Sequence, residues 1–265
     1  MRPNAPTAIQ RDGRTLLLAM DHGLEHGPTD FEPVPDTVDP ETVFDVATHD
    51  AVTALAVGKG VAETYYPSYE DDVALVAKLN GATNLRLGEP VSPKNMTVDY
   101  AAELGADAVG YTLYPGSNHE PEMFEEFRAV QERAREYDLP VVLWSYPRGQ
   151  GVKNDTKADV IAYAARIALE LGADVTKIKH PGSREAMAWA TRAAGEVDVL
   201  VSGGSKTDER AFLETVRSTL DAGGTGLAVG RNVWQREDPE RMLDALERVV
   251  FEDDTPDAAL RGAVA

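Results

Sequence analysis

Two lysines placed two residues apart carry the clearest chemical signal in the sequence. They are Lys177 and Lys179, within the stretch "VTKIKHPG" from Val175 to Gly182. In a strand, side chains two residues apart point to the same side, so both ammonium groups would face one place. Burial and a neighbouring like charge lower the pKa of an amine, and a neutral lysine can attack a carbonyl to form a Schiff base. We therefore predict a catalytic amine here. The alternative is that both lysines only form ion pairs inside the fold.

A Schiff-base mechanism also needs a proton carrier and a fixed carboxylate. Tyr146 ends the apolar run "PVVLWSY", and its phenol can both donate and accept a proton. Asp21 directly follows the run "TLLLAM", where a carboxylate needs a buried cation as its partner. We expect a lysine across the fold to be that partner. On pattern alone, Tyr146 is equally compatible with a core aromatic whose hydroxyl is hydrogen-bonded.

Two glycine-rich turns predict a phosphate site. The first is "SGG", which comprises Ser202, Gly203 and Gly204, and the second is "VGR", which ends with Gly230 and Arg231. We expect both turns at helix N-termini, where backbone N–H groups favour anions, and a guanidinium suits two-pronged contact with phosphate. The stretch "SGGSKT" lacks the upstream glycine of a nucleotide P-loop. The alternative is that these residues are ordinary turn glycines.

The histidines do not form a metal motif. His22 and His26 are four residues apart, but Gly23 and Gly27 predict a loop instead of a helix that would aim both rings at one ion. No third ligand follows at metal-binding spacing, and the chain contains no cysteine. We expect His26 to contact the substrate or to orient the loop, and we expect neither a metal nor another cofactor.

The elements that must position these residues follow from the apolar pattern. Eight short runs, mostly apolar throughout, are typical of parallel strands buried on both faces, and helical segments lie between them. The runs are 15–20, 51–57, 73–80, 107–114, 140–146, 175–180, 199–204 and 226–231. This alternation predicts an α/β protein with a single (β/α)8 TIM barrel. An open doubly wound sheet is the alternative, but no Gly-x-Gly-x-x-Gly follows the first run.

The domain and helix boundaries can also be predicted. We expect one TIM-barrel domain over residues 1–265, with the barrel from about residue 14 to 250 and short extensions at both ends. One helix should start after Asp155 or Thr156 and stop at Gly172. Another should start at Thr207 or Asp208 and end at Gly223. Active sites of this fold lie at the carboxyl ends of the strands, where the candidate residues above are found.

The charge balance narrows the choice of partners. The 265 residues include 45 acidic and 26 basic side chains, which gives a net charge of −19. The charge is dispersed, which favours a solvated surface suited to concentrated salt over a docking surface for a cationic partner. Nucleic acid is an unfavourable partner, because phosphate binding needs a basic face. The apolar runs are too short to span a membrane and no secretory signal is evident, so we expect a cytoplasmic protein without a membrane partner.

Several long motifs occur in an order that resembles the archaeal-type class I fructose-bisphosphate aldolases, Schiff-base enzymes related to deoxyribose-phosphate aldolase. They are "MDHGLEHGPTDF", "GEPVS", "LWSYPRG", "YAARIALELGAD", "KIKH", "SGG" and "AVGRNVWQR". The resemblance implies that Lys177 forms the Schiff base, that Tyr146 is the acid/base and that Asp21 assists proton transfer. Spacing alone does not separate Lys177 from Lys179. The resemblance implies that the substrate is held by His22, His26, Trp144, Arg148, Lys179, Ser202, Gly203, Gly204, Gly230 and Arg231.

The same resemblance implies a reaction and an assembly. The reaction is reversible cleavage of fructose 1,6-bisphosphate, a phosphorylated sugar, to glyceraldehyde 3-phosphate and dihydroxyacetone phosphate. It proceeds through a lysine imine with no metal. The assembly implied is a homo-oligomer, a decamer. The sequence departs from the family pattern at His180, where tyrosine is more usual, and at the following Pro181.

Two other functions compete with this one. A sister branch uses the same lysine and tyrosine as a 2-amino-3,7-dideoxy-D-threo-hept-6-ulosonate synthase, which builds a precursor of aromatic amino acids. That branch typically lacks the second histidine of "DHGLEHGP", so His26 favours the aldolase branch. The other alternative is a barrel without catalytic activity that only binds phosphosugars.

Overall fold

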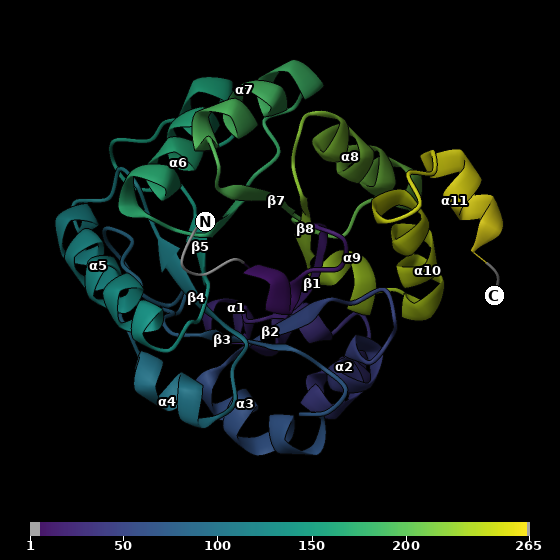
Figure 1. The fold of residues 1–265 in the computed structure, drawn as a ribbon, viewed down its shortest axis with the longest axis horizontal. Coiled ribbons are helices and arrows are strands. Elements are labelled where there is room, and N and C mark those ends of the chain that lie inside the picture. Colours follow the sequence, from purple (N-terminus) through teal and green to yellow (C-terminus); the bar gives the residue numbers. More distant parts are fainter. Residues whose placement is uncertain (1–5, 264–265) are drawn as a thin grey trace.

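A closed barrel of parallel strands forms the centre of the computed structural model, which describes residues 6–263. Each strand pairs with the next along the chain, and β8 closes the ring on β1 (Figure 1). The strands are β1 (Thr15–Met20), β2 (Ala54–Gly58), β3 (Leu75–Lys78), β4 (Ala108–Leu113), β5 (Val141–Ser145), β6 (Val175–Ile178), β7 (Asp198–Ser202) and β8 (Gly226–Val229). Every predicted run overlaps one strand. The prediction of a TIM barrel is therefore confirmed, and the open sheet is excluded.

Helices form a ring around the strands (Figure 1). The α-helices are α1 (Gly23–His26), α2 (Pro40–Ala47), α3 (Lys59–Tyr65), α4 (Val98–Glu103), α5 (Glu120–Glu136), α6 (Ala158–Leu171), α7 (Arg184–Ala194), α8 (Glu209–Asp221), α9 (Arg231–Trp234), α10 (Pro239–Val250) and α11 (Pro256–Gly262). Short 3-10 helices occur at η1 (Pro6–Ile9), η2 (Gly27–Phe31), η3 (Pro35–Val38) and η4 (Tyr66–Ser68). Within residues 6–263, no helix combines the length and the hydropathy that a bilayer crossing requires.

Side-chain caps and a left-handed glycine set the helix ends. Asp208 accepts a hydrogen bond from the backbone N–H of Ala211, so the predicted start of α8 at Asp208 is confirmed. Gly172 ends α6 at a φ of 78°, as expected of a C-terminal glycine. The prediction that Asp155 or Thr156 caps α6 is wrong. Lys157 occupies that position, because the carboxylate of Asp155 is instead paired with Lys179.

Two separate apolar clusters explain why the strands are buried on both faces. The larger lies between the barrel and the helices, and the smaller fills the barrel interior. The smaller cluster takes alternate residues from the strands, which include Leu17, Val76, Val142, Val175 and Leu200. Since strand side chains alternate with a period of two, the next inward positions continue toward the carboxyl ends. These positions carry Ala19, Lys78, Trp144, Lys177 and Ser202.

The N-terminal residues close the opposite end of the barrel. Ile9 of η1 is fully buried in the inner cluster. The next residue, Gln10, donates a hydrogen bond to Asp198 at the first position of β7. The barrel interior is thus filled at the amino ends of the strands, and the polar inward residues gather at the carboxyl ends.

Candidate active site

The carboxyl ends of the strands open into one cavity of about 290 Å³. All the site residues predicted from the sequence line this cavity. They are Asp21, His22, His26, Trp144, Tyr146, Arg148, Lys177, Lys179, Ser202, Gly203, Gly204, Gly230 and Arg231. The structure therefore brings together every predicted residue, while the chemical role of each stays a prediction.

Strand register and one glycine place the central side chains. Lys177 of β6 is opposite Trp144 of β5, so the amine lies beside the indole, 5.3 Å from the ring centre. The indole and Lys78 both occupy space above Gly110 of β4. A Cβ on Gly110 would lie 2.5 Å from the Trp144 ring and 3.2 Å from Cδ of Lys78. Only glycine at this position lets both side chains enter the cavity.

Lys177 is the amine best suited to attack a carbonyl. Burial lowers its pKa to about 8, the charge of Asp21 acts against this, and the charges of Lys78 and Arg231 lower it further. The side chain is buried, yet it lines the cavity. At neutral pH the unprotonated fraction of this amine is therefore about a tenth, far more than that of a free lysine, and this fraction can form a Schiff base.

Lys179 lines the same cavity but has a different environment. It follows the last residue of β6, and its ammonium is paired with the carboxylate of Asp155 in the loop before α6. The expectation that both lysines face one place is correct. The like charges that act most on Lys177 nevertheless come from Lys78 and Arg231 and not from Lys179.

Asp21 has a buried cation as its partner, as predicted from its position after β1. Its carboxylate lies 3.6 Å from Nζ of Lys78, the last residue of β3 on the neighbouring side of the barrel. Burial alone would raise the pKa of Asp21, but the charges of Lys78 and Lys177 outweigh this and hold it below its usual value. Asp21 is therefore ionised in the resting site.

Tyr146 is a neutral phenol in the resting site. Burial and the charge of Asp21 raise its pKa well above 10, while Arg148 and a hydrogen bond with Ser202 act the other way. The ring of Tyr146 lies 6.0 Å from the guanidinium carbon of Arg148. Arg148 itself is paired with Glu25 at 2.7 Å. A proton is thus available on Tyr146 at any pH near neutrality.

The two histidines lie on one helical turn, and the predicted loop is therefore wrong. The backbone N–H of His26 bonds to the carbonyl of His22, because Gly23 to His26 form the short helix α1. His22 stacks on Trp234 with ring centres 5.0 Å apart, and burial lowers the pKa of His22 to about 4. His26 contacts Asp30 at 2.7 Å. Both imidazoles therefore stand at fixed places beside the cavity.

The loops after β7 and β8 differ from the expected pair of helix N-termini. Gly230 does begin a helix, the four-residue α9, but α8 starts only at Glu209, after the loop 203–208. The N–H of Gly203 already bonds to the carbonyl of Ala228. Among residues 6–263, the N–H groups of Gly204 and Ser205 are not used in this way, and Arg231 stands across from them. An anion here would meet loop N–H groups and a guanidinium instead of the end of a long helix.

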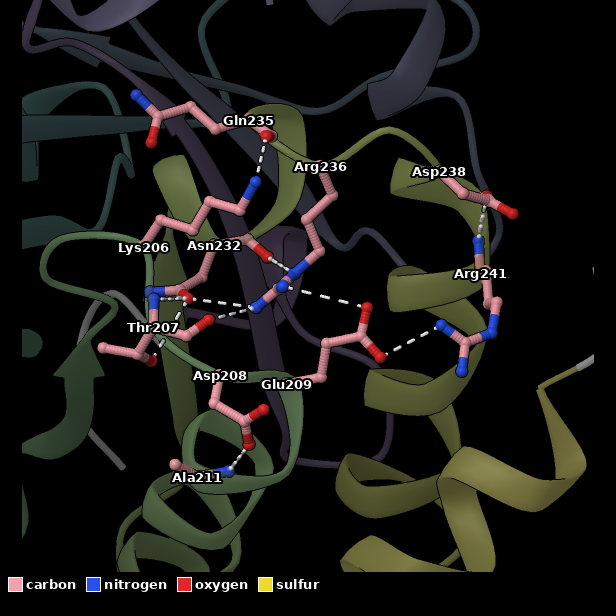
Figure 2. Close-up of polar contacts among 10 residues, drawn as sticks. All are labelled: Lys206, Thr207, Asp208, Glu209, Ala211, Asn232, Gln235, Arg236, Asp238 and Arg241. Carbon is pink, nitrogen blue, oxygen red and sulfur yellow. Dashed lines mark hydrogen bonds and ion pairs between the residues drawn. The ribbon is translucent and has the colours of Figure 1, made fainter. Parts of the chain in front are cut away.

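A buried polar network joins these two loops (Figure 2). The amide of Asn232 donates to the carbonyls of Gly203 at 2.7 Å and Ser205 at 2.9 Å, and its oxygen accepts the N–H of Thr207 at 2.9 Å. The guanidinium of Arg236 donates to the backbone carbonyl of Asn232 and to that of Thr207. Asn232 and Arg236 are both buried. The network therefore fixes the loop 203–208 against α9, and both residues belong to the motif "AVGRNVWQR".

Four further residues of the site had no role assigned from the sequence. Lys78 and Glu25 stand at strand ends or in a quoted motif, but their partners Asp21 and Arg148 are known only once the barrel closes. Asp30 contacts His26 and lies 3.5 Å from Arg231, a residue about 200 positions away in sequence. The hydroxyl of Ser92 is buried at the cavity without a partner among the described residues. Asp30 and Ser92 belong to the motifs "MDHGLEHGPTDF" and "GEPVS", but the motifs do not indicate what either residue contacts.

The structure also shows the surroundings of His180 and whether side chains are grouped as metal ligands. His180 does not line the cavity, since its ring faces Ser218 of α8 at 3.4 Å on the outer side of the barrel. Its departure from the family pattern therefore does not alter the cavity wall. Across residues 6–263, no three histidine, aspartate or glutamate side chains are grouped as metal ligands.

Comparison with known proteins agrees with this geometry. Residues 15–236 match the model of the DeoC/LacD family aldolases. The chain is 65% identical to the class 1 fructose-bisphosphate aldolase of Halobacterium salinarum, over 98% of this chain and 99% of that protein. It is 50% identical to the class 1 enzyme of Thermoproteus tenax, over 91% of both chains. The 2-amino-3,7-dideoxy-D-threo-hept-6-ulosonate synthase of Halobacterium salinarum is more distant, at 33% identity over 96% of this chain and 93% of that protein.

Solved structures extend the comparison to the chemistry. One is an archaeal fructose-1,6-bisphosphate aldolase with its catalytic lysine covalently bound to the carbinolamine intermediate of the substrate. It is 48% identical to this chain, with a TM-score of 0.89, over 92% of this chain and 96% of that one.

Proposed function

Because the chain belongs to the DeoC/LacD family of aldolases, and within it to the archaeal class I group, we propose that it cleaves fructose 1,6-bisphosphate through an imine on Lys177. The products are glyceraldehyde 3-phosphate and dihydroxyacetone phosphate, and the reaction is reversible. The observation that carries this proposal is the buried amine of Lys177, with a pKa lowered to about 8, inside a cavity lined by cations. The chemistry needs no metal, because the protonated imine itself accepts the electron pair.

The first step forms the imine. The neutral amine of Lys177 adds to the C2 carbonyl of the open-chain sugar and gives a carbinolamine. The hydroxyl of this intermediate takes up a proton from solvent and leaves as water, so that a protonated imine remains. Asp21 is ionised, and the charges of Lys78 and Lys177 act on it. It therefore stabilises the positive charge that stays on the nitrogen of Lys177.

The second step breaks the bond between C3 and C4. The proton of the C4 hydroxyl passes to Tyr146 as Tyr146 gives its own proton toward Asp21, because the buried phenol is neutral at rest and Asp21 is ionised. The electron pair of the broken bond moves to the imine and gives an enamine, and glyceraldehyde 3-phosphate leaves. Tyr146 then protonates the enamine carbon as Asp21 returns its proton to the phenol, which restores the resting state of both groups. Water adds to the imine and releases dihydroxyacetone phosphate and a proton, and Lys177 is left as the neutral amine.

The cations at the rim account for a substrate with two phosphates. Arg231 and the N–H groups of Gly204 and Ser205 suit one phosphate after β7 and β8. Arg148 and Lys179, at the ends of β5 and β6, suit the other. We assign His22, His26 and Trp144 to the sugar hydroxyls, since all three line the cavity. This arrangement lets a chain with a net charge of −19 bind an anionic substrate.

The setting of the enzyme is part of the proposal. We propose a single-domain protomer that forms a homo-oligomer in the cytoplasm, with a surface whose acidic charge suits concentrated salt. The exposed aromatic rings of Tyr163 on α6 and Trp189 on α7 support assembly, because such rings are common at interfaces between subunits. Light scattering of the purified protein at low and high salt would give the subunit number.

Direct assay of fructose 1,6-bisphosphate cleavage tests the proposed function. We expect turnover in concentrated salt with a chelator present and no added metal, and loss of that turnover in Lys177→Met. The matched control is Lys59→Met, which changes an exposed lysine outside the cavity. A protein that forms the seven-carbon precursor but does not cleave fructose 1,6-bisphosphate would contradict the proposal, and so would an active Lys177→Met variant.

A further inference from the structure

Lys78 is a buried cation that the mechanism above does not use. It ends β3 with 6% of its surface exposed. Its Nζ lies 3.6 Å from the carboxylate of Asp21 and donates to the carbonyl of Asn80 at 3.1 Å. It also stands 5.2 Å from the centre of the Trp144 ring. Burial lowers the pKa of Lys78, but each of these contacts favours the charged form.

One carboxylate serves two lysines. Lys177 stands 5.3 Å from the centre of the same indole ring, and the charges of both lysines act on Asp21. Asp21 can neutralise only one ammonium. The ion pairs described at the cavity assign it to Lys78, since none of those within residues 6–263 includes Lys177. A proton on Lys177 would therefore face the charge of Lys78 without a carboxylate of its own.

The other ionisable groups around the pair do not change this balance. Besides the lysines themselves, the charged groups that act on Lys177 or Lys78 are Asp21 after β1, Glu25 in α1 and Arg231 in α9, and Arg148 after β5 acts on the nearby Tyr146. Glu25 is paired with Arg148 at 2.7 Å, and Asp30 lies 3.5 Å from Arg231. The inward residues at the ends of β4 and β7, Thr112 and Ser202, carry no charge. Asp21 is thus the anion for which the two lysines compete.

We propose that Lys78 is a positioning residue that favours the neutral form of Lys177, both by occupying the carboxylate of Asp21 and by presenting a like charge to the second amine. The inference rests on the proposed function in taking Lys177 as the imine lysine. Removing the charge of Lys78 has two effects, and both raise the pKa of Lys177. Asp21 becomes free to pair with Lys177, and the repulsion disappears, so the pKa of Lys177 rises.

The test measures the ionisation of Lys177 without any substrate. Trace acetic anhydride labels only neutral amines, and mass spectrometry of the peptide that holds Lys177 gives its labelling rate from about pH 6 to about pH 11. In the wild-type protein we expect the midpoint near pH 8. In Lys78→Met it should move up by about 1–3 pH units. Lys78→Arg keeps the charge and should keep the midpoint near the wild-type value.

Controls distinguish a failure of this inference from a variant that does not fold and from a failure of the proposed function. Each variant is first checked by its thermal unfolding, and Lys78→Gln replaces Lys78→Met if the latter does not fold. Asp21→Asn should move the midpoint of Lys177 downward, because the competing anion is lost. An unchanged midpoint in a folded Lys78→Met or Lys78→Gln variant would overturn the inference. Failure of the wild-type protein to cleave fructose 1,6-bisphosphate would refute the proposed function alone, because the labelling needs no substrate.

Discussion

Replacing Asn232 by alanine should loosen the loop that binds one phosphate. The side chain is fully buried, and its hydrogen bonds reach Gly203, Ser205, Thr207 and Arg236. Each such bond contributes about 1 kcal/mol net, and a buried group left without a partner costs about 1–3 kcal/mol. Water will replace some of them, so we expect a loss of about 2–5 kcal/mol in the free energy of unfolding. For a chain of this size, the melting temperature should fall by about 5–15 °C.

The same substitution should weaken phosphate binding, because Gly204 and Ser205 lose the contact that holds their loop against α9. We expect the dissociation constant of inorganic phosphate, measured by calorimetry, to rise about tenfold or more. Asn232→Asp keeps the oxygen that accepts the N–H of Thr207 and should fall between alanine and the wild type. Asn118→Ala, at an exposed position, is the control for the substitution itself. A destabilised Asn232→Ala protein with unchanged phosphate affinity would refute the role of this network in binding.

Three further outcomes follow from the site. Tyr146→Phe should keep imine formation with dihydroxyacetone phosphate, trapped by cyanoborohydride, but lose about 10²–10⁴-fold in the cleavage rate; an equal loss of trapping would contradict its assignment to proton transfer. Imine formation should increase with pH through a midpoint near pH 8 and level off above it, because Lys177 has a pKa of about 8 and is mostly neutral at higher pH; a midpoint near pH 10, the value of a free lysine, would show that the site does not lower it. Arg231→Gln should raise the KM for fructose 1,6-bisphosphate about tenfold or more, and an unchanged KM would remove Arg231 from the phosphate site.

Strand periodicity made much of the site predictable. Val175 and Lys177 share the inner face of β6, as do Val142 and Trp144 on β5, so residues at strand ends could be placed inside the barrel from their spacing. The fold class followed from the same runs. The family resemblance then selected Lys177 over Lys179, and the lowered pKa of Lys177 agrees with that choice.

Contacts across the barrel were not predictable, because they depend on its closure. Asp21 follows β1 and Lys78 ends β3, and these strands do not pair directly. Asp30 and Arg231 follow β1 and β8 and meet only because β8 closes the ring on β1. Loop conformations were also missed. The glycines after β7 suggested a helix N-terminus at the turn itself, whereas α8 starts after Asp208, the cap that the sequence had also predicted. The four residues Gly23–His26 form a helical turn despite their glycine, since His26 bonds back to His22.

The central claim is that Lys177 bonds covalently to the sugar ketone, and trapping the adduct tests it most directly. The protein is incubated with dihydroxyacetone phosphate and reduced with borohydride, and its peptides are mapped by mass spectrometry. We predict a single stable adduct on Lys177. An adduct on Lys78 or Lys179, or the absence of any adduct in a protein that cleaves fructose 1,6-bisphosphate, would contradict the account.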